Sequence, residues 1–130
     1  IRDSLDGITF AFVCIDHGPS KKPIFEKLEK LDVSFIDVGM GLELEGASLG
    51  GILRVTTSTP RDRACLHSGK VSFVDDGDEG VYASNIQTSD MNALNATMAV
   101  MKWKKLIGFY RDLSQEHHSL FTMDTNMLVS

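Results

Sequence analysis

The stretch Thr9–Asp16, TFAFVCID, decides how this chain folds. Six of its first seven residues are apolar, and polar residues do not alternate with them. Such a run is typical of a strand that is buried on both faces of a parallel sheet. Asp16 closes the run, and ligands of open α/β sheets lie outside the carboxyl ends of the strands. Its carboxylate is therefore placed to reach a metal or a phosphate-bound metal, although an aspartate at a strand-to-helix turn also commonly satisfies loop amides.

A strand, a helix and a second strand follow one another at the start of the chain. Residues Ser20–Leu31 predict a helix, with Ser20 as its cap and apolar side chains at helical spacing on one face. Ser34–Val38 predicts the second strand, ended by the segment 39–41 (GMG), whose glycines permit a sharp turn. This order indicates one right-handed βαβ unit with a parallel strand pair.

The pattern then changes to antiparallel structure. Leu42–Glu45 and Gly51–Thr57 predict a hairpin around residues 46–50, and residues 40–44 can extend its first arm. The polar segment 58–87 predicts a long crossover, in which only Val71–Val74 has strand character. Crossovers of this length in compact domains are usually functional or disordered.

The longest predicted helix is Thr88–Ile107, with an acid in its first turn and lysines in its last. Its middle, residues 93–101 (ALNATMAVM), is apolar on nearly all sides, which predicts a buried helix. Ser119–Met123 and Met127–Val129 predict a closing hairpin. The predicted fold class is α/β: a single Rossmann-like three-layer domain over residues 1–130, with a parallel βαβ unit, antiparallel strands and one long buried helix.

Composition narrows the class of function. The chain has 130 residues, a net charge of −5 and an isoelectric point near 5.2, so no basic surface is available for nucleic acid or a membrane. Cys14 falls in the buried strand and Cys65 in a polar segment, which argues against a disulfide and favours a reducing, cytoplasmic setting. No stretch is long and apolar enough to predict a membrane span.

Three local groupings of chemical side chains are weak candidates for sites. The acids of segment 75–79 lack the ligand spacing of a calcium loop and predict a solvated loop. Glu116-His117-His118 offers metal ligands, but neighbouring side chains of an extended chain point to opposite faces. Cys65 and His67 could form a thiol–base pair, but no third group orients them. No phosphate-binding glycine loop of either common type occurs in the sequence.

The order of these motifs resembles the C-terminal half of the ThiF/MoeB/HesA adenylyltransferases, relatives of the ubiquitin-activating enzymes. The resemblance rests on VCID, SFIDVGMG, the GGILRV strand, the long helix NALNATMAVMKWKKLIGF and the last hairpin. It implies that Asp16 serves the magnesium of bound ATP. It also places Lys21 where the family commonly has a cofactor-binding arginine, which keeps the charge but not the guanidinium fork.

The departures from the family pattern matter as well. His17 replaces an asparagine, and Cys65 stands alone where many members have the first of two zinc-binding cysteine pairs, so a four-thiolate zinc site is excluded by count. Segment 82–86 (YASNI) lacks the cysteine that thioester- or persulfide-forming members carry before the long helix. The family's glycine-rich ATP loop lies upstream of the aspartate-bearing strand, and the sequence begins close before that strand.

The resemblance implies an ATP-dependent enzyme, homodimeric in the parent protein, that adenylates the C-terminal carboxylate of a ubiquitin-like or sulfur-carrier protein. A fragment with the magnesium-side acid but without the phosphate loop is expected to be nearly inactive alone. Two alternatives remain open. One is a non-catalytic dimerisation or docking module with the same half-Rossmann fold. The other is the substrate domain of a nicotinamide-dependent oxidoreductase, which predicts a His-Lys acid/base pair that the sequence does not display.

Overall fold

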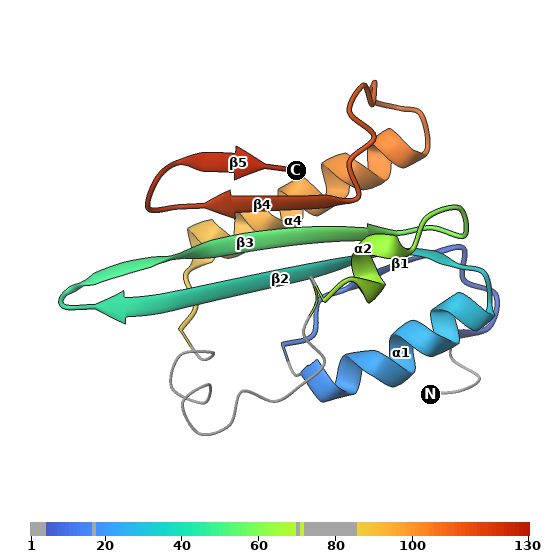
Figure 1. Cartoon of the computed structure of the whole chain (residues 1–130), viewed down its shortest axis with the longest axis horizontal. Helices are drawn as coiled ribbons and strands as arrows, with labels where there is room; N and C mark the ends of the chain where they lie inside the picture. Colours follow the sequence, from blue (N-terminus) through green and yellow to red (C-terminus); the bar gives the residue numbers. More distant parts are fainter. Residues whose placement is uncertain (1–4, 17, 70, 72–85) are drawn as a thin grey trace.

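The computed structural model describes residues 5–16, 18–69, 71 and 86–130. Five strands form one mixed sheet in the order β1-β2-β3-β4-β5 (Figure 1). Strand β1 runs parallel to β2, and every later pair is antiparallel, which confirms the predicted α/β class. The strands are β1 (Phe10–Val13), β2 (Ser34–Glu45), β3 (Ser48–Ser58), β4 (His118–Thr122) and β5 (Met127–Val129).

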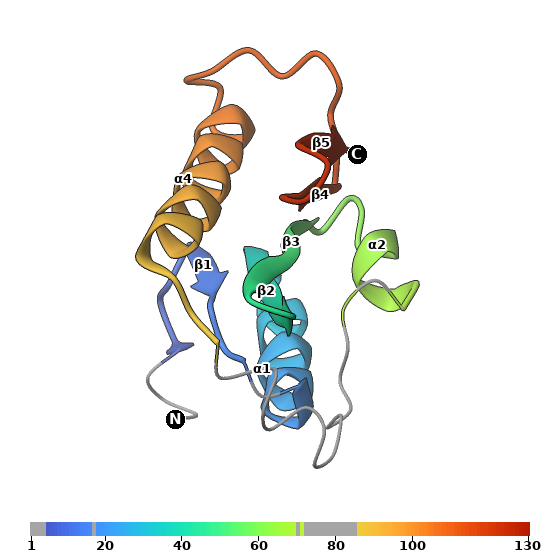
Figure 2. The same ribbon diagram turned by 90° about the vertical axis from the view of Figure 1, so that its left-hand side faces the viewer.

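Helices lie on both faces of this sheet, so the fold has three layers (Figure 2). Helix α1 (Gly18–Lys30) and the short α2 (Ala64–His67) cover one face, and α4 (Ser89–Leu106) covers the other. Helix α1 begins two residues earlier than predicted and returns the chain from β1 to β2. The predicted βαβ unit is therefore confirmed.

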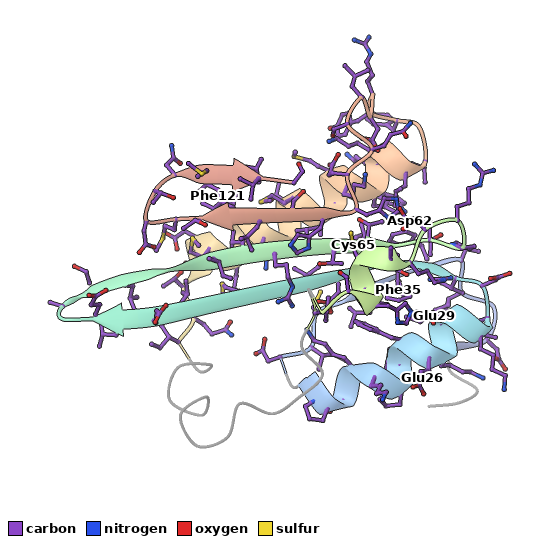
Figure 3. The ribbon with its side chains drawn as sticks, in the orientation of Figure 1. Glu26, Glu29, Phe35, Asp62, Cys65 and Phe121 are labelled. Carbon is purple, nitrogen blue, oxygen red and sulfur yellow. The ribbon has the colours of Figure 1, made fainter. Side chains whose placement is uncertain are left out.

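The core on the α1 face is built around two phenylalanines. Phe25 of α1 and Phe35 of β2 have ring centroids 5.0 Å apart, and both side chains are buried. Figure 3 shows Phe35 on the side of the sheet that faces α1. Leu28 and Leu66 complete the same cluster, which joins α1 and α2 to the sheet. Full burial of each such side chain contributes about 1.5–3 kcal/mol relative to exposure. The apolar face that the sequence predicts for α1 is thus the face that packs on β2.

Strand β1 is shorter and less buried than its sequence predicts. It pairs with β2 from Phe10 to Val13 and stands first in the sheet order. Val13 faces the core, but Phe12 is 42% exposed and Cys14 is exposed. The prediction of burial on both faces was wrong for this strand, because an apolar run does not reveal whether a strand is central or lies at an edge.

Segment 39–41 continues β2 and does not end it. Strand β2 runs to Glu45, and a two-residue turn at Gly46 and Ala47 leads into β3, so the predicted hairpin is longer and tighter than expected. Gly39 is paired with Arg54, and a Cβ there would collide with the Arg54 guanidinium. The glycines predict a turn, but Gly39 lies within the strand, where a Cβ would require the guanidinium at the end of the Arg54 side chain to move.

Helix α4 lies on the sheet with one face buried and the other open. Met91, Asn95, Ala99 and Lys102 are buried, whereas Leu94, Val100 and Met101 are 39%, 41% and 45% exposed. The helix was correctly predicted to within one residue at each end, but complete burial was wrong. Its inner face has one sheet to pack on, and within the described residues no second layer covers its outer face.

The closing hairpin is confirmed as β4 and β5, with β4 antiparallel to β3. None of the helices in the described ranges has the length and apolar character required to cross a lipid bilayer. Several predictions fall outside the described residues: the role of His17, the acidic segment 75–79, and most of the strand Val71–Val74 and of segment 82–86.

Candidate functional site

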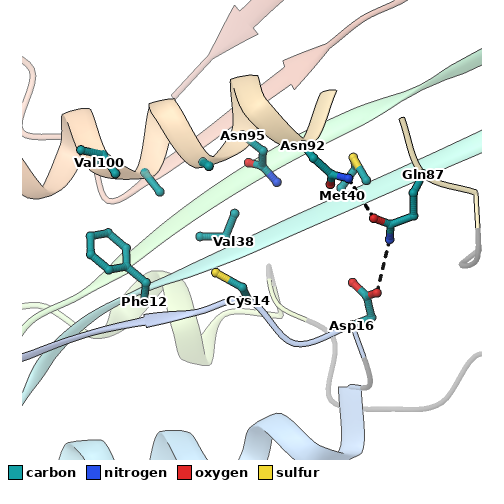
Figure 4. A pocket seen from close by; sticks show the side chains of 11 residues that line it. Phe12, Cys14, Asp16, Val38, Met40, Gln87, Asn92, Asn95 and Val100 are labelled. Atoms are coloured by element: carbon teal, nitrogen blue, oxygen red, sulfur yellow. Dashed lines mark hydrogen bonds between the residues drawn. The ribbon is translucent and has the colours of Figure 1, made fainter. Parts of the chain in front are cut away.

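A cleft of about 300 Å³ lies where β1 ends and β2 continues, beneath the N-terminal half of α4 (Figure 4). The last β1–β2 pair joins Val13 to Asp37, and β2 extends eight residues further, to Glu45. Asp16 follows the end of β1 by three residues and lines this cleft. The predicted position of the acid, outside the carboxyl end of a parallel strand, is therefore confirmed.

The cleft has an apolar wall and a polar end. The apolar side chains come from β1, β2 and α4; they are Phe12, Val38, Met40, Ala96, Ala99 and Val100. The polar side chains are Cys14, Asp16, Gln87, Asn92 and Asn95. A concave site with an apolar body and a few convergent polar groups is the usual form of a small-molecule or peptide-end site.

Two amide side chains connect Asp16 to α4. Gln87 Nε2 donates to Asp16 Oδ2 at 3.4 Å, and Asn92 Nδ2 donates to Gln87 Oε1 at 3.0 Å (Figure 4). Asp16 itself is exposed, so its carboxylate remains accessible to a ligand in the cleft. The hydrogen bond with Gln87 adds a side-chain partner to the loop contacts that an aspartate at a strand-to-helix turn commonly makes.

Asn95 lines the cleft from the buried face of α4. It is 4% exposed, and its Nδ2 donates to the Gly39 carbonyl at 3.0 Å. Gly39 lies beyond the last residue of β2 that pairs with β1, so Asn95 supplies a donor where the neighbouring strand has ended. Its Oδ1 is buried without a hydrogen-bond partner among the described residues.

Lys21, the second predicted site residue, is directed elsewhere. It is buried, and its Nζ lies 3.2 Å from Oδ1 and 3.3 Å from Oδ2 of Asp37 on β2. Arg54 Nη2 binds the same carboxylate at 3.1 Å. Lys21 is not among the residues that line the cleft. Its charge is balanced by Asp37, and direct contact between Lys21 and a cofactor would require that buried ion pair to break.

Both cysteines are free thiols, as predicted from the sequence. Partial burial and the nearby Asp37 carboxylate raise the pKa of the Cys14 thiol, and the Lys21 ammonium opposes this only in part. A raised pKa makes Cys14 a poor nucleophile at neutral pH. Cys65 lies on α2 (Figure 3), and His67 Nε2 contacts Glu29 Oε1 at 2.7 Å. Among the described residues no hydrogen bond joins Cys65 to His67, so the structure does not bring this weak candidate together as a thiol–base pair.

The Glu116-His117-His118 segment is likewise occupied by structural contacts. His117 Nδ1 bonds the Thr57 carbonyl, and His118 Nδ1 bonds Thr56 Oγ1. Glu116 is partly buried, which opposes ionisation, but hydrogen bonds from Ser114, its own backbone amide and Lys105, together with the Lys102 charge, lower its pKa to about 2. In the part of the chain that is described, no group of three or more His, Cys, Asp or Glu residues is arranged to hold a metal.

Sequence reasoning identified Asp16 but missed Gln87, Asn92 and Asn95. A signal was present, because Asn92 and Asn95 are spaced three residues apart in a helix that is otherwise apolar at that point. Residues at this spacing lie on the same helix face. Two amides on one face of a packed helix indicate a polar patch at its contact with the sheet.

Comparison with known proteins adds no assignment. The sequence matches none of the protein-family models against which it was scanned, and no curated protein matches it.

Proposed function

We propose that this chain forms the magnesium-side part of an adenylation site that activates the C-terminal carboxylate of a ubiquitin-like or sulfur-carrier protein with ATP. The observation that carries the proposal is the position of Asp16, an exposed carboxylate just beyond a parallel strand, at the polar end of the cleft. The sequence resemblance supports the same role. A cytoplasmic location belongs to this proposal, in keeping with the two free cysteines.

The chemistry of the cleft fits a magnesium ion carried by a nucleotide. Magnesium prefers oxygen ligands and is commonly held by one or two carboxylates together with substrate phosphates and water. Asp16 offers one such carboxylate, and the neighbouring side chains Gln87 and Asn92 are neutral amides that add no competing positive charge. The ion would neutralise charge on the phosphates and on the pyrophosphate that leaves.

The reaction requires little covalent chemistry from the protein. A carboxylate oxygen of the carrier tail attacks the α-phosphorus, a new acyl–oxygen–phosphorus bond forms, and the bond between the α-phosphorus and the bridging oxygen to the β-phosphate breaks. Residues of this chain position the reactants: Asp16 fixes the charged end, and the apolar side chains of Val38 and Ala99 line the wall. The product is an acyl adenylate. A following thioester step on Cys14 is disfavoured by its raised pKa.

The proposal is tested by Asp16→Asn in the natural protein that contains this chain. We expect exchange of labelled pyrophosphate into ATP to fall by about 100-fold or more, the scale of losing one preorganised electrostatic group. Glu43→Gln is the matched control, because Glu43 is an exposed acid of β2 that does not line the cleft. Equal exchange in the Asp16 variant and the wild type would remove Asp16 from the site. The 130-residue chain alone is expected to show negligible exchange.

A second candidate function is a dimerisation or docking module. It is favoured by Leu94 and Met101, apolar side chains of α4 that do not line the cleft and are each more than a third exposed. Sedimentation equilibrium and pyrophosphate exchange together distinguish the two, because the proposed enzyme is also expected to be a dimer. A module predicts an oligomer that Met101→Lys dissociates and that exchanges no pyrophosphate. Exchange by the natural protein that contains this chain supports the enzyme.

A further inference from the structure

We infer that Gln87 is a positioning residue for Asp16, and that α4 orients the metal-binding carboxylate through it; this rests on the proposed function. Neither residue is held by regular structure at this point, since Asp16 follows the end of β1 and Gln87 precedes α4. They are separated by 71 positions in the sequence and meet through one hydrogen bond at the polar end of the cleft.

The chemistry of the three side chains fixes the direction of the hydrogen bonds. A carboxylate accepts hydrogen bonds and cannot donate them, so Gln87 must turn its Nε2 toward Asp16. Its Oε1 then faces Asn92, which must donate with Nδ2, as the 3.0 Å contact shows. Each amide orientation requires the other, and a flipped Gln87 would set its carbonyl oxygen against the carboxylate.

Helix α4 provides the rigid end of this chain of contacts. Asn92 lies in its first turn, where the backbone amide donates to the Thr88 carbonyl at 3.0 Å, and the adjacent Met91 is buried against the sheet. The helix therefore fixes Asn92, Asn92 orients Gln87, and Gln87 restrains Asp16. Gln87 binds only Oδ2, and a carboxylate has about four acceptor positions, so the restrained Asp16 can still bind a cation.

The first test compares ATP binding with and without magnesium, by titration calorimetry on the natural protein that contains this chain. Gln87→Leu keeps much of the side-chain volume and removes the amide. We expect its affinity for ATP to fall about 5- to 10-fold in excess magnesium, the scale of one partly exposed hydrogen bond to a charged group. In EDTA the variant and the wild type should bind ATP equally. A loss of the same size in EDTA would show that Gln87 acts on the fold or the nucleotide, and would overturn the inference.

Two further variants define the pathway. Asn92→Ala leaves the Gln87 amide in place but unoriented, and is expected to cause a smaller loss, about 2- to 3-fold, again only with magnesium. Thr97→Val is the control, because Thr97 is partly solvent-facing on α4 and its hydroxyl bonds the Ala93 carbonyl; it should leave both affinities unchanged. A full-sized loss in the control would mean that any change on α4 perturbs the site, and would count against a specific role for Gln87.

A double-mutant cycle separates this inference from the proposed function. If Gln87 acts through Asp16, then Asp16→Ala and the double variant Asp16→Ala/Gln87→Leu should bind MgATP with the same affinity. A further loss in the double variant would assign Gln87 an independent role. If Asp16→Ala itself binds MgATP as the wild type does, the proposed function fails. If Asp16→Ala weakens binding and Gln87→Leu does not, the positioning role alone fails.

Discussion

Replacing Asp37 with asparagine tests how far the buried ion pairs determine the stability of the sheet. Asp37 is fully buried on β2, between Lys21 of α1 and Arg54 of β3. The substitution keeps the shape of the side chain and removes its charge. It leaves the Lys21 ammonium, itself only 5% exposed, without a counter-ion among the described residues, whereas Arg54 is 19% exposed and can still reach water.

The expected cost is about 3 kcal/mol, at the lower end of the 3–5 kcal/mol typical when one partner of a buried pair is removed. A domain of this size has a total stability of about 5–15 kcal/mol, so the variant should still fold. Urea unfolding can be followed by the fluorescence of Trp103, the one tryptophan of the chain, whose ring lies 6.4 Å from Phe10 of β1. With a slope of about 1–3 kcal/mol per molar urea, the midpoint should fall by about 1–3 M.

The stability of a double variant, compared with that of Asp37→Asn alone, decides whether this reasoning is correct. Lys21→Met alone should cost less, about 1 kcal/mol, because Asp37 keeps its contact with Arg54. Asp37→Asn combined with Lys21→Met should be more stable than Asp37→Asn, since the unpaired buried ammonium has been removed. If the double variant is instead the less stable of the two, the cost of Asp37→Asn does not come from an unpaired lysine, and the explanation is refuted.

Three other predictions concern two glycines, the Glu116 carboxylate between α4 and β4, and the Cys14 thiol in the cleft. Gly51→Ala should lower the free energy of unfolding in urea by about 1–3 kcal/mol or more, because its Cβ would meet the Gly41 backbone carbonyl. Gly7→Ala is the comparison: its Cβ would enter open space, so the only cost is that of an alanine at positive φ, about 1 kcal/mol. The pKa of Glu116 is about 2 in the folded protein against an ordinary 4.5, so its stabilisation is complete above pH 4.5 and is lost as the pH falls through 2. Glu116→Gln should therefore flatten the stability profile between those pH values, by an amount that solvent screening reduces for this partly exposed side chain, and an unchanged slope would contradict the assignment. Cys14, whose pKa is raised, should react with iodoacetamide at neutral pH more slowly than a free cysteine. Asp37→Asn should speed this reaction, and equal rates in the variant and the wild type would exclude the Asp37 charge as a cause of the raised pKa.

Much of the fold was predictable from the sequence because its elements are separated by clear local signals. Helix α4 shows this well: an acid in the first turn, lysines in the last and Gly108 after it located both ends. Local signals did not predict which faces of these helices and strands are covered by a neighbouring layer. The same apolar side chains, such as Phe12 and Val100, are compatible with burial and with exposure, and the number of layers that cover them decides which occurs.

The glycines show a second limit of sequence reasoning. Gly39 favours a turn when it is considered with its sequence neighbours, but in the sheet it lies opposite Arg54, whose guanidinium leaves no room for a Cβ. Arg54 is placed there by the register of the β2–β3 hairpin, which is fixed by a turn seven residues further along the chain from Gly39. A local pattern cannot reveal a contact that a distant turn determines.

The candidate site arises from a difference in strand length. Because β1 ends at Val13 while β2 continues, the chain after β1 leaves the sheet and carries Asp16 toward α4. Because β1 ends before this point, the Gly39 carbonyl has no partner on β1, and Asn95 of α4 donates a hydrogen bond to it. Helix α4 therefore donates a hydrogen bond to the unpaired edge of β2 through Asn95. It also restrains the exposed Asp16 through Asn92 and Gln87. An acid beyond a short strand acquires a fixed position in this fold only because a long helix crosses the place where that strand ends.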